Sequence, residues 1–296
     1  MKQQTLAMAA DKGFEQFRRP TKRDVFLNMM DKVMPCEELC AVVQPHYPKG
    51  EGGRPPVGLE RMLRMLLVQH WFNLADEACE EALYDSASLR SSVGIDLGRE
   101  RVPDATTLLK FRRLLEKHHL GQALFAKVGE VLQGHGLKVG TGTIVDATII
   151  SAPSSTKNAD KKRDPEMHQV AKGKNCFFGM KLHIGVDSHT GLAHSAVVAA
   201  ANVHDKHPLP ELLHGEELKV YGDCAYAGQQ ELIASKAPAA LDCTNERVRK
   251  VDGVPDEGQR LRNRNRSKVR AQVEVVKRLW GFSKVRYRGL HKNATR

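Results

Sequence analysis

The chain of 296 residues is 41% hydrophobic and 27% charged, a balance that excludes a chain disordered throughout. Its apolar runs are too short to cross a bilayer, and its first residues lack the apolar core of a signal peptide. We therefore expect a soluble cytoplasmic protein with no membrane partner. The length fits one large domain or two of moderate size.

The positive charge is concentrated at one end of the chain. The formal net charge is +11, and residues 246–296 alone hold 16 Lys and Arg against 5 Asp and Glu, so the rest of the chain is neutral. A neutral body with a basic end favours a polyanionic partner, most simply nucleic acid. A solubilising basic tail is equally compatible with the composition. Aromatic residues make up only 5%, which argues against stacking on single strands and favours duplex DNA.

Six cysteines are spread over the chain, and only Cys36 and Cys40 lie close together. No second pair and no nearby histidine completes a zinc site. The sequence predicts buried, reduced thiols.

The N-terminal part, residues 1–136, is predicted to be largely helical. Hydrophobic residues at helical spacing mark a helix that begins at Leu59, and a short acidic helix follows at 76–84. Asp104 is a suitable N-cap for a third helix, and a fourth spans about 119–132. We interpret this region as a DNA-binding unit, with a purely structural helical bundle as the alternative.

From Gly140 onward the pattern changes to that of strands. The most hydrophobic segment is TIVDATII at 143–150, typical of a buried central strand. A polar, lysine-rich stretch at 153–176 is expected to leave the sheet, as a loop that contacts DNA or is simply solvated. The remaining expected elements are strands at 177–186, 192–201, 218–223 and 239–244, a helix from 229 and a long basic helix at 257–280.

Two carboxylates stand at strand positions. Asp146 lies on the same face of its strand as Ile144, Thr148 and Ile150, where a carboxylate is costly unless it is hydrogen-bonded, paired or bound to a metal. Asp223 ends a short strand in VYGDCAYAG, and α/β sheets usually meet ligands at the carboxyl ends of strands. Each also has an ordinary interpretation, because Asp146 can cap a neighbouring loop and Asp223 can close an Asx turn.

A third carboxylate interrupts a stripe of arginines in the predicted basic helix. The row of charged residues, each four from the next, is Arg262, Arg266, Arg270, Glu274 and Arg278. This spacing fits a ladder of ion pairs on the helix surface, or arginines that bind phosphates beside a glutamate that binds a metal. Spacing alone leaves both interpretations open.

Three acids on two strands and one helix suit a hard divalent cation. Mg²⁺ or Mn²⁺ takes carboxylate ligands and keeps waters for substrate phosphates. A pair of such ions stabilises the attacking and leaving oxygens of a phosphodiester displacement, and basic residues hold the DNA backbone. His204, Asp205 and His207 also have the composition of a metal site, but a solvent-facing loop is the preferred interpretation there.

At these residues the sequence resembles the DDE transposases of bacterial insertion sequences, of the insertion-sequence-five group. The resemblance covers most of the chain and follows the family's order. It rests on GRPP (53–56), VPDATTLLKFRRLLE (102–116), IVDATIISAPSSTKN (144–158), FGMKLHIGVDSHTGL (178–192), NVHD (202–205), GDCAYAG (222–228) and RNRSKVRAQVE (264–274).

The resemblance implies a helical DNA-binding region (1–136) followed by an RNase H-like α/β catalytic domain (137–296), with a mixed sheet flanked by helices. Asp146, Asp223 and Glu274 match the family's three acids, which hold two divalent metal ions. The implied activity is cleavage at the inverted-repeat ends of a DNA element, with water as nucleophile, followed by transfer of the freed 3′-hydroxyl to target DNA.

The resemblance also implies contacts to the DNA. Arg270 matches the arginine that precedes the family's glutamate. The residues expected to contact phosphates are Arg266, Arg270, Lys277, Arg278 and Lys284. The expected partners are double-stranded DNA and further copies of the chain on that DNA, and the expected location is the cytoplasm, in association with the nucleoid.

The sequence departs from the family pattern near its end. Ser267 and Gly281 stand where the family has a tyrosine and a lysine, and YRGLHKNATR stops where such proteins usually continue into another helix. Two alternatives stay open. One is a catalytically impaired DNA-binding remnant of a transposase, in which the shortened C-terminus has broken the site. The other is a nuclease of the same fold that cuts DNA without joining it.

Overall fold

The computed structural model describes residues 19–50, 55–137, 140, 142–246, 250–251, 254–255, 276–278 and 280–295. The chain divides into two compact units, Met1–Val131 with Thr295 and Leu132–Ala294 with Arg296. The predicted division into a DNA-binding region and a catalytic domain at residues 136 and 137 stays a prediction. Within the described ranges, no helix has both the length and the hydrophobicity needed to span a membrane.

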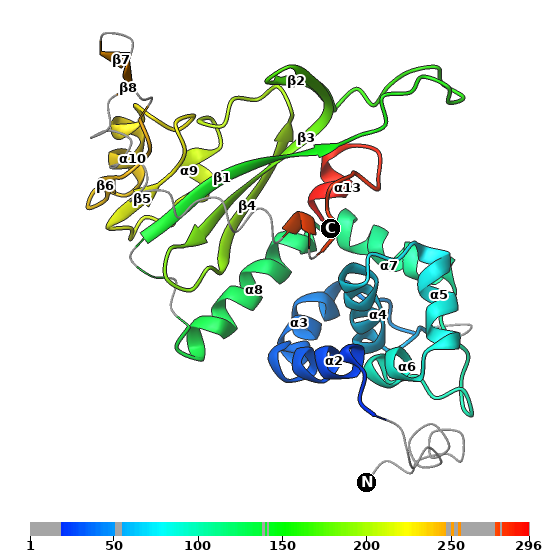
Figure 1. The fold of residues 1–296 in the computed structure, drawn as a ribbon. Helices are drawn as coiled ribbons and strands as arrows, with labels where there is room; N and C mark the ends of the chain where they lie inside the picture. The colour runs from blue at the N-terminus through cyan, green and yellow to red at the C-terminus, as the bar shows by residue number, and fades with distance from the viewer. Residues whose placement is uncertain are drawn as a thin grey trace. The chain divides into compact units, whose positions relative to one another are not determined.

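The first unit is helical (Figure 1). Its helices are α2 (Lys22–Val33), α3 (Cys36–Val43), the 3₁₀ helix η1 (Gln44–His46), α4 (Leu59–Trp71), α5 (Asp76–Asp85), α6 (Ala87–Val93) and α7 (Ala105–Lys117). A further helix, α8 (Leu120–Gly134), begins in the first unit and ends in the second. The four helices predicted between residues 57 and 135 are confirmed as α4, α5, α7 and α8, whereas the sequence analysis does not predict α2, α3 and α6.

Local hydrogen bonds explain where these helices begin and end. Asp104 is the N-cap of α7, as predicted, and its carboxylate accepts the N–H of Thr107 at 2.6 Å. Thr21 and Asp24 form a capping box at the start of α2, a signal that the sequence analysis misses. Helix α6 ends at Gly94, whose φ of 78° suits the left-handed conformation of a helix C-terminus.

The second unit is built on a mixed six-stranded sheet, drawn in green and yellow in Figure 1. Its strands are β1 (Gly142–Ser151), β2 (His168–Lys172), β3 (Asn175–Asp187), β4 (Ala193–Ala200), β5 (Lys219–Tyr221) and β6 (Leu241–Asp242). Strand β1 lies inside the sheet, antiparallel to β3 and parallel to β5, and β3 also pairs with β2 and β4. A separate hairpin joins β7 (Lys250–Val251) to β8 (Val254–Pro255).

Hydrophobic clusters cover both faces of this sheet. Val145 packs in one cluster with residues of α9 (Leu209–Leu212) and α10 (Gln230–Lys236). Ile150, five residues further along β1 and therefore on the opposite face, packs with Met180 and with residues near α13 (Leu290–Ala294). Burial on both faces explains why β1 is almost wholly apolar. The predicted fold class, a helical region followed by an RNase H-like mixed sheet flanked by helices, is confirmed.

The prediction that residues 153–176 leave the sheet is wrong for its last part. Residues His168–Lys172 form β2, which pairs with the start of β3. The chain reverses over two residues, and Gly173 adopts a φ of 64° there, a conformation that favours glycine. The dipeptide Gly-Lys after a short polar strand is a weak hairpin signal, so the sequence pattern alone resembles a loop.

The prediction of buried thiols is also wrong for most of the cysteines. All six are free, as expected, but Cys176 and Cys224 are exposed and only Cys79 is buried. Burial raises the pKa of Cys79 to about 12, which keeps it a thiol at physiological pH.

Replacement of Gly179 by alanine is expected to destabilise the second unit by about 1–3 kcal/mol. A Cβ at Gly179 would lie 2.1 Å from the carbonyl oxygen of Ile150 and 2.9 Å from the nitrogen of Ala152. Both atoms belong to the backbone at the end of β1, so the sheet itself would have to shift. Urea unfolding followed by circular dichroism measures the change.

The matched control for this substitution is Gly129→Ala in α8. An added Cβ there meets no neighbouring atom within 4 Å, and alanine is the better helix former. This change is expected to raise the free energy of unfolding by about 0.5–1 kcal/mol. Equal effects of the two substitutions would contradict the packing argument.

Candidate active site

Asp146 occupies the middle of β1, opposite Ile184 of β3, and is partly buried. One oxygen of its carboxylate accepts the N–H of Ala147 at 2.8 Å, and among the described residues the side chain caps no neighbouring loop. No described residue forms an ion pair with it. Burial raises the pKa of Asp146 to about 6, and the negative charges of Asp223 and Asp205 add to this effect.

Asp223 follows β5 and is exposed. Its Oδ1 accepts the N–H of Ala225 at 2.8 Å, so the Asx turn considered in the sequence analysis is present. The charge of Asp223 also acts on Asp146, which shows that the two carboxylates lie within electrostatic reach of each other. Asp223 therefore closes the Asx turn and also lies within electrostatic reach of Asp146, so the two interpretations of this residue do not exclude each other.

One aromatic ring packs against both segments that carry these acids. Tyr226 is 1% exposed and belongs to the same cluster as Val145, the residue before Asp146. A Cβ at Gly222, the residue before Asp223, would lie 3.1 Å from the side chains of both Tyr226 and Val145. The backbone at Gly222 thus approaches β1 closely. This contact holds the two acid-bearing segments side by side.

A third carboxylate, Asp205, which the sequence pattern assigns to a solvent-facing loop, lies within electrostatic reach of Asp146. Lys181 of β3 donates to Asp205 Oδ1 at 2.8 Å and to the carbonyl of Val203 at 2.8 Å. The predicted solvent-facing loop is correct for His204 and His207, which are exposed, but Asp205 is only 23% exposed. The reason is Lys181, which is 12% exposed and needs a carboxylate partner at that depth.

Two buried polar side chains lie within reach of Asp205. The ring nitrogens of His183 and the hydroxyl of Tyr226 have no hydrogen-bond partner among the described residues. Burial lowers the pKa of His183 to about 4 and raises the pKa of Tyr226 well above its ordinary value, and the charge of Asp205 acts on both. Both groups are therefore neutral at physiological pH.

The remaining predicted site residues are only partly described. Glu274, Arg266 and Arg270 lie outside the described residues, as does most of the predicted helix at 257–280. The fragment 276–278 is helical. In the described part of the chain, no group of three or more His, Cys, Asp or Glu residues is arranged to hold a metal ion.

One basic residue, Lys172 of β2, lies within electrostatic reach of Asp146. Burial is the main cause that lowers the pKa of Lys277, and the positive charge of Lys172 is the second. The same charge of Lys172 acts to lower the pKa of Asp146. Lys284 is exposed, and its backbone forms an isolated parallel β-bridge with Ser151 at the end of β1. Arg278 is exposed. The structure thus brings Lys277 within reach of Lys172, and Lys172 within reach of Asp146.

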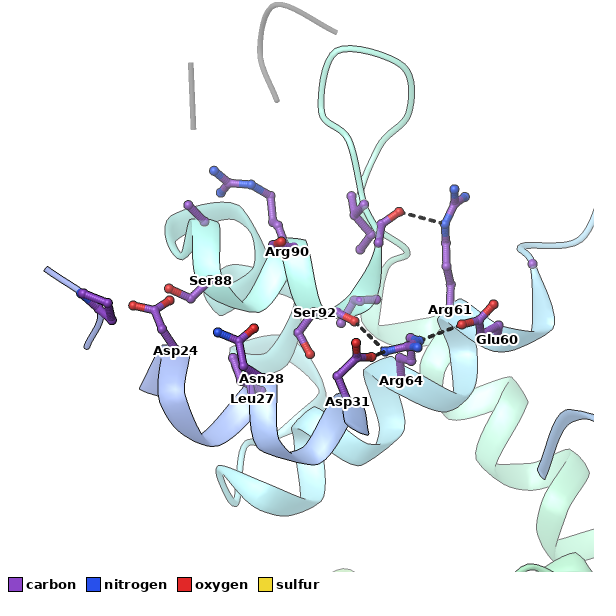
Figure 2. A pocket seen from close by; sticks show the side chains of 17 residues that line it. Asp24, Leu27, Asn28, Asp31, Glu60, Arg61, Arg64, Ser88, Arg90 and Ser92 are labelled. Carbon is purple, nitrogen blue, oxygen red and sulfur yellow. Dashed lines mark hydrogen bonds and ion pairs between the residues drawn. The ribbon is translucent and has the colours of Figure 1, made fainter. Parts of the chain in front are cut away.

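A pocket of about 820 Å³ in the first unit lies between α2, α4 and α6 (Figure 2). Its arginines are engaged by their neighbours. Arg64 donates to Glu60 at 2.8 Å and to Asp31 at 2.5 Å, and Arg61 donates to the carbonyl of Gly94 at 3.2 Å. Because acidic side chains compensate the guanidinium groups, the pocket is a weak candidate for binding phosphate. The candidate site is therefore the acid cluster of the second unit.

Two family profiles match the chain. One, described as Transposase domain (DUF772), matches residues 15–114, and the other, described as Transposase DDE domain, matches residues 138–296, more than half of the chain. No solved structure gives a significant match. The second profile covers the sheet, Asp146, Asp223 and Glu274. The chain therefore belongs to the DDE transposases of insertion sequences, enzymes that cleave DNA and transfer the cut strands to new DNA.

Proposed function

We propose that Asp146, Asp223 and Glu274 are the catalytic acids of this transposase and that they bind two Mg²⁺ or Mn²⁺ ions. The observation that carries the proposal is the state of Asp146, a partly buried carboxylate with no cationic partner among the described residues. The packing of Val145, Tyr226 and Gly222 holds it beside a second carboxylate. Such a pair is unfavourable unless a cation neutralises it.

The donor chemistry of the two described acids fits a hard cation. Each carboxylate accepts one backbone N–H through Oδ1, Asp146 from Ala147 and Asp223 from Ala225. These hydrogen bonds orient the side chains, and the second oxygen of each carboxylate, Oδ2, accepts no hydrogen bond from the described residues. Oxygen donors of this kind are the ligands that Mg²⁺ prefers. When bound, two such ions stabilise the attacking and leaving oxygens of an in-line phosphodiester displacement.

The basic residues are proposed to hold the DNA around this site. Lys277, Arg278 and Lys284 would bind backbone phosphates together with Arg266 and Arg270, and Arg270 would also orient Glu274. Support comes from the charge of Lys172, which acts on both Asp146 and Lys277, and from the +11 charge of residues 246–296.

Further parts of the proposal concern the whole molecule. The helical region binds double-stranded DNA at the inverted-repeat ends, and target DNA is the second substrate. Because two DNA ends must be processed together, the active form is proposed to be a homo-oligomer on DNA, in the cytoplasm and associated with the nucleoid. The proposal also assigns the chain to the insertion-sequence-five group, with the family motifs quoted from the sequence as its support.

The proposal is tested with purified protein, DNA that carries the ends of the element, a target plasmid and a Mg²⁺ titration. Wild type is expected to cleave the ends and join them to the plasmid. Removal of a residue that only supports a metal ligand typically lowers activity roughly 10–100-fold. Asp223→Asn and Glu274→Gln are each expected to lower the amounts of cleaved and joined product by more than that. The loss reflects a missing carboxylate ligand.

Asp160→Asn is the control with the same change of charge, because Asp160 pairs with Arg288 on the exposed surface. It is expected to leave both products unchanged. Wild-type product levels in Asp223→Asn and Glu274→Gln would refute the assignment of the acids. Cleaved ends without joined product would identify a nuclease of the same fold instead.

A further inference from the structure

The ion pair between Lys181 and Asp205 has no part in the function proposed above, yet it is built into the same region of the sheet. Lys181 projects from β3 and binds both the Asp205 carboxylate and the Val203 carbonyl, each at 2.8 Å. Both side chains are largely buried, which makes the pair costly to assemble compared with a surface ion pair. A simple loop closure would not require a buried charge.

Contacts and charges link Asp205 to the acid site. The ring of Tyr226 packs with Val145 and against Gly222, the residues that precede Asp146 and Asp223. Of the charges acting on Tyr226, that of Asp205 is the strongest, and Asp146 and Asp223 follow. The backbone links Asp205 to the same strand, because Lys181, which binds Asp205, pairs across the sheet with Ile149, three residues from Asp146.

The hydrogen bonding of Asp205 leaves part of its carboxylate available. Oδ1 accepts the Lys181 ammonium, whereas Oδ2 has no donor among the described residues. The side chain keeps 23% of its surface exposed, so water reaches it. The carboxylates do not form a described group close enough to hold one metal ion directly. Any action of Asp205 on a cation must therefore pass through intervening water.

We propose that Asp205, anchored by Lys181, is a positioning residue of the cation site that accepts hydrogen bonds from water molecules on the cation bound by Asp146 and Asp223. Its negative charge strengthens cation binding, and its fixed position orients those waters. Lys181 holds the carboxylate in place and limits the repulsion between it and the two acids. The inference rests on the proposed role of Asp146 and Asp223.

The test measures Mn²⁺ binding to the full, DNA-free chain by isothermal titration calorimetry at fixed ionic strength. Asp205→Asn keeps an oxygen that accepts the Lys181 ammonium but removes the charge, and it is expected to weaken Mn²⁺ binding roughly tenfold. Asp205→Glu keeps the charge and is expected to restore most of the affinity, because a contact made through water tolerates one additional methylene. Asp160→Asn, with the same change of charge on a distant exposed pair, is expected to bind as wild type.

The outcomes separate this inference from the proposed function. Wild-type affinity in Asp205→Asn, with binding lost in Asp146→Asn, overturns the role of Asp205 and leaves the acid site intact. Wild-type affinity in Asp146→Asn refutes the acid site itself. Thermal unfolding of each metal-free variant gives the fraction of protein that is folded at the assay temperature. Each measured Mn²⁺ affinity is corrected for that fraction. Weakening in Asp205→Glu as large as in Asp205→Asn would show a structural role only and would also overturn the proposal.

Discussion

Replacement of Asp146 by asparagine is expected to abolish DNA cleavage and, at the same time, to stabilise the metal-free protein. The activity is lost because the change removes a carboxylate ligand from the proposed cation site. The stability rises because the native site is unfavourable for a negative charge, as the raised pKa of Asp146 shows. A gain in stability with a loss of activity is the signature of a residue kept for function.

The stability effect depends on pH in a defined direction. Asp146 has an ordinary pKa of 3.8 and a pKa of about 6 in the folded protein. Below pH 3.8 the group is protonated in both the folded and unfolded states and contributes nothing. As the pH rises from about 4 to 6, the unfolded state ionises more readily, so the folded state loses stability relative to it. Above pH 6 the full cost is present, on the order of 3 kcal/mol.

Urea unfolding of wild type and Asp146→Asn at pH 4 and pH 8, without divalent ions, measures this effect. The variant is expected to be more stable than wild type by about 3 kcal/mol at pH 8, with much of the difference gone at pH 4. Addition of Mg²⁺ at pH 8 is expected to stabilise wild type and not the variant, because only wild type binds the ion. A variant less stable than wild type at pH 8 would contradict the unfavourable setting assigned to Asp146.

Replacement of Asp76 by alanine is expected to destabilise the helical unit by about 3–5 kcal/mol, because it removes the carboxylate that binds the buried guanidinium of Arg112. Arg112 of α7 is 5% exposed and binds Asp76 of α5 through two parallel hydrogen bonds, at 2.8 and 2.7 Å. Gln69 of α4 donates to the same carboxylate at 2.6 Å. The network therefore connects three helices, and its loss affects the packing of all of them.

A second variant separates the buried charge from the lost contact. Asp76→Ala combined with Arg112→Met removes both charges and is expected to recover most of the lost stability. Glu130→Ala, which breaks an exposed pair with Lys127, is the surface control and is expected to change the free energy of unfolding by less than about 1 kcal/mol. Urea unfolding measures all three. A cost for Asp76→Ala no larger than that of Glu130→Ala would contradict the prediction.

Local patterns in the sequence are sufficient for much of the fold. The N-cap Asp104, the helical spacing of leucines in α4 and the apolar run of β1 predict elements that the structure confirms, because each depends on residues a few positions apart. Helices α2 and α3 are missed although both are rich in hydrophobic residues, because only Leu27 of α2 and Leu39 and Val43 of α3 are buried, and tertiary packing decides which residues these are. Strand β2 is missed because it is a polar strand, stabilised mainly by pairing with β3.

For the candidate site, the sequence by itself determines which acids are unusual. A carboxylate within an apolar strand and another after a short strand are visible in the order of residues, and Asp146 and Asp223 are identified in this way. Only the tertiary structure decides that these two lie within electrostatic reach, through the contact of Val145, Tyr226 and Gly222. It also decides that Lys181 anchors Asp205 beside them. The physical reason is that burial and charge interactions depend on distance in space, which residues far apart in the chain acquire only when the sheet forms.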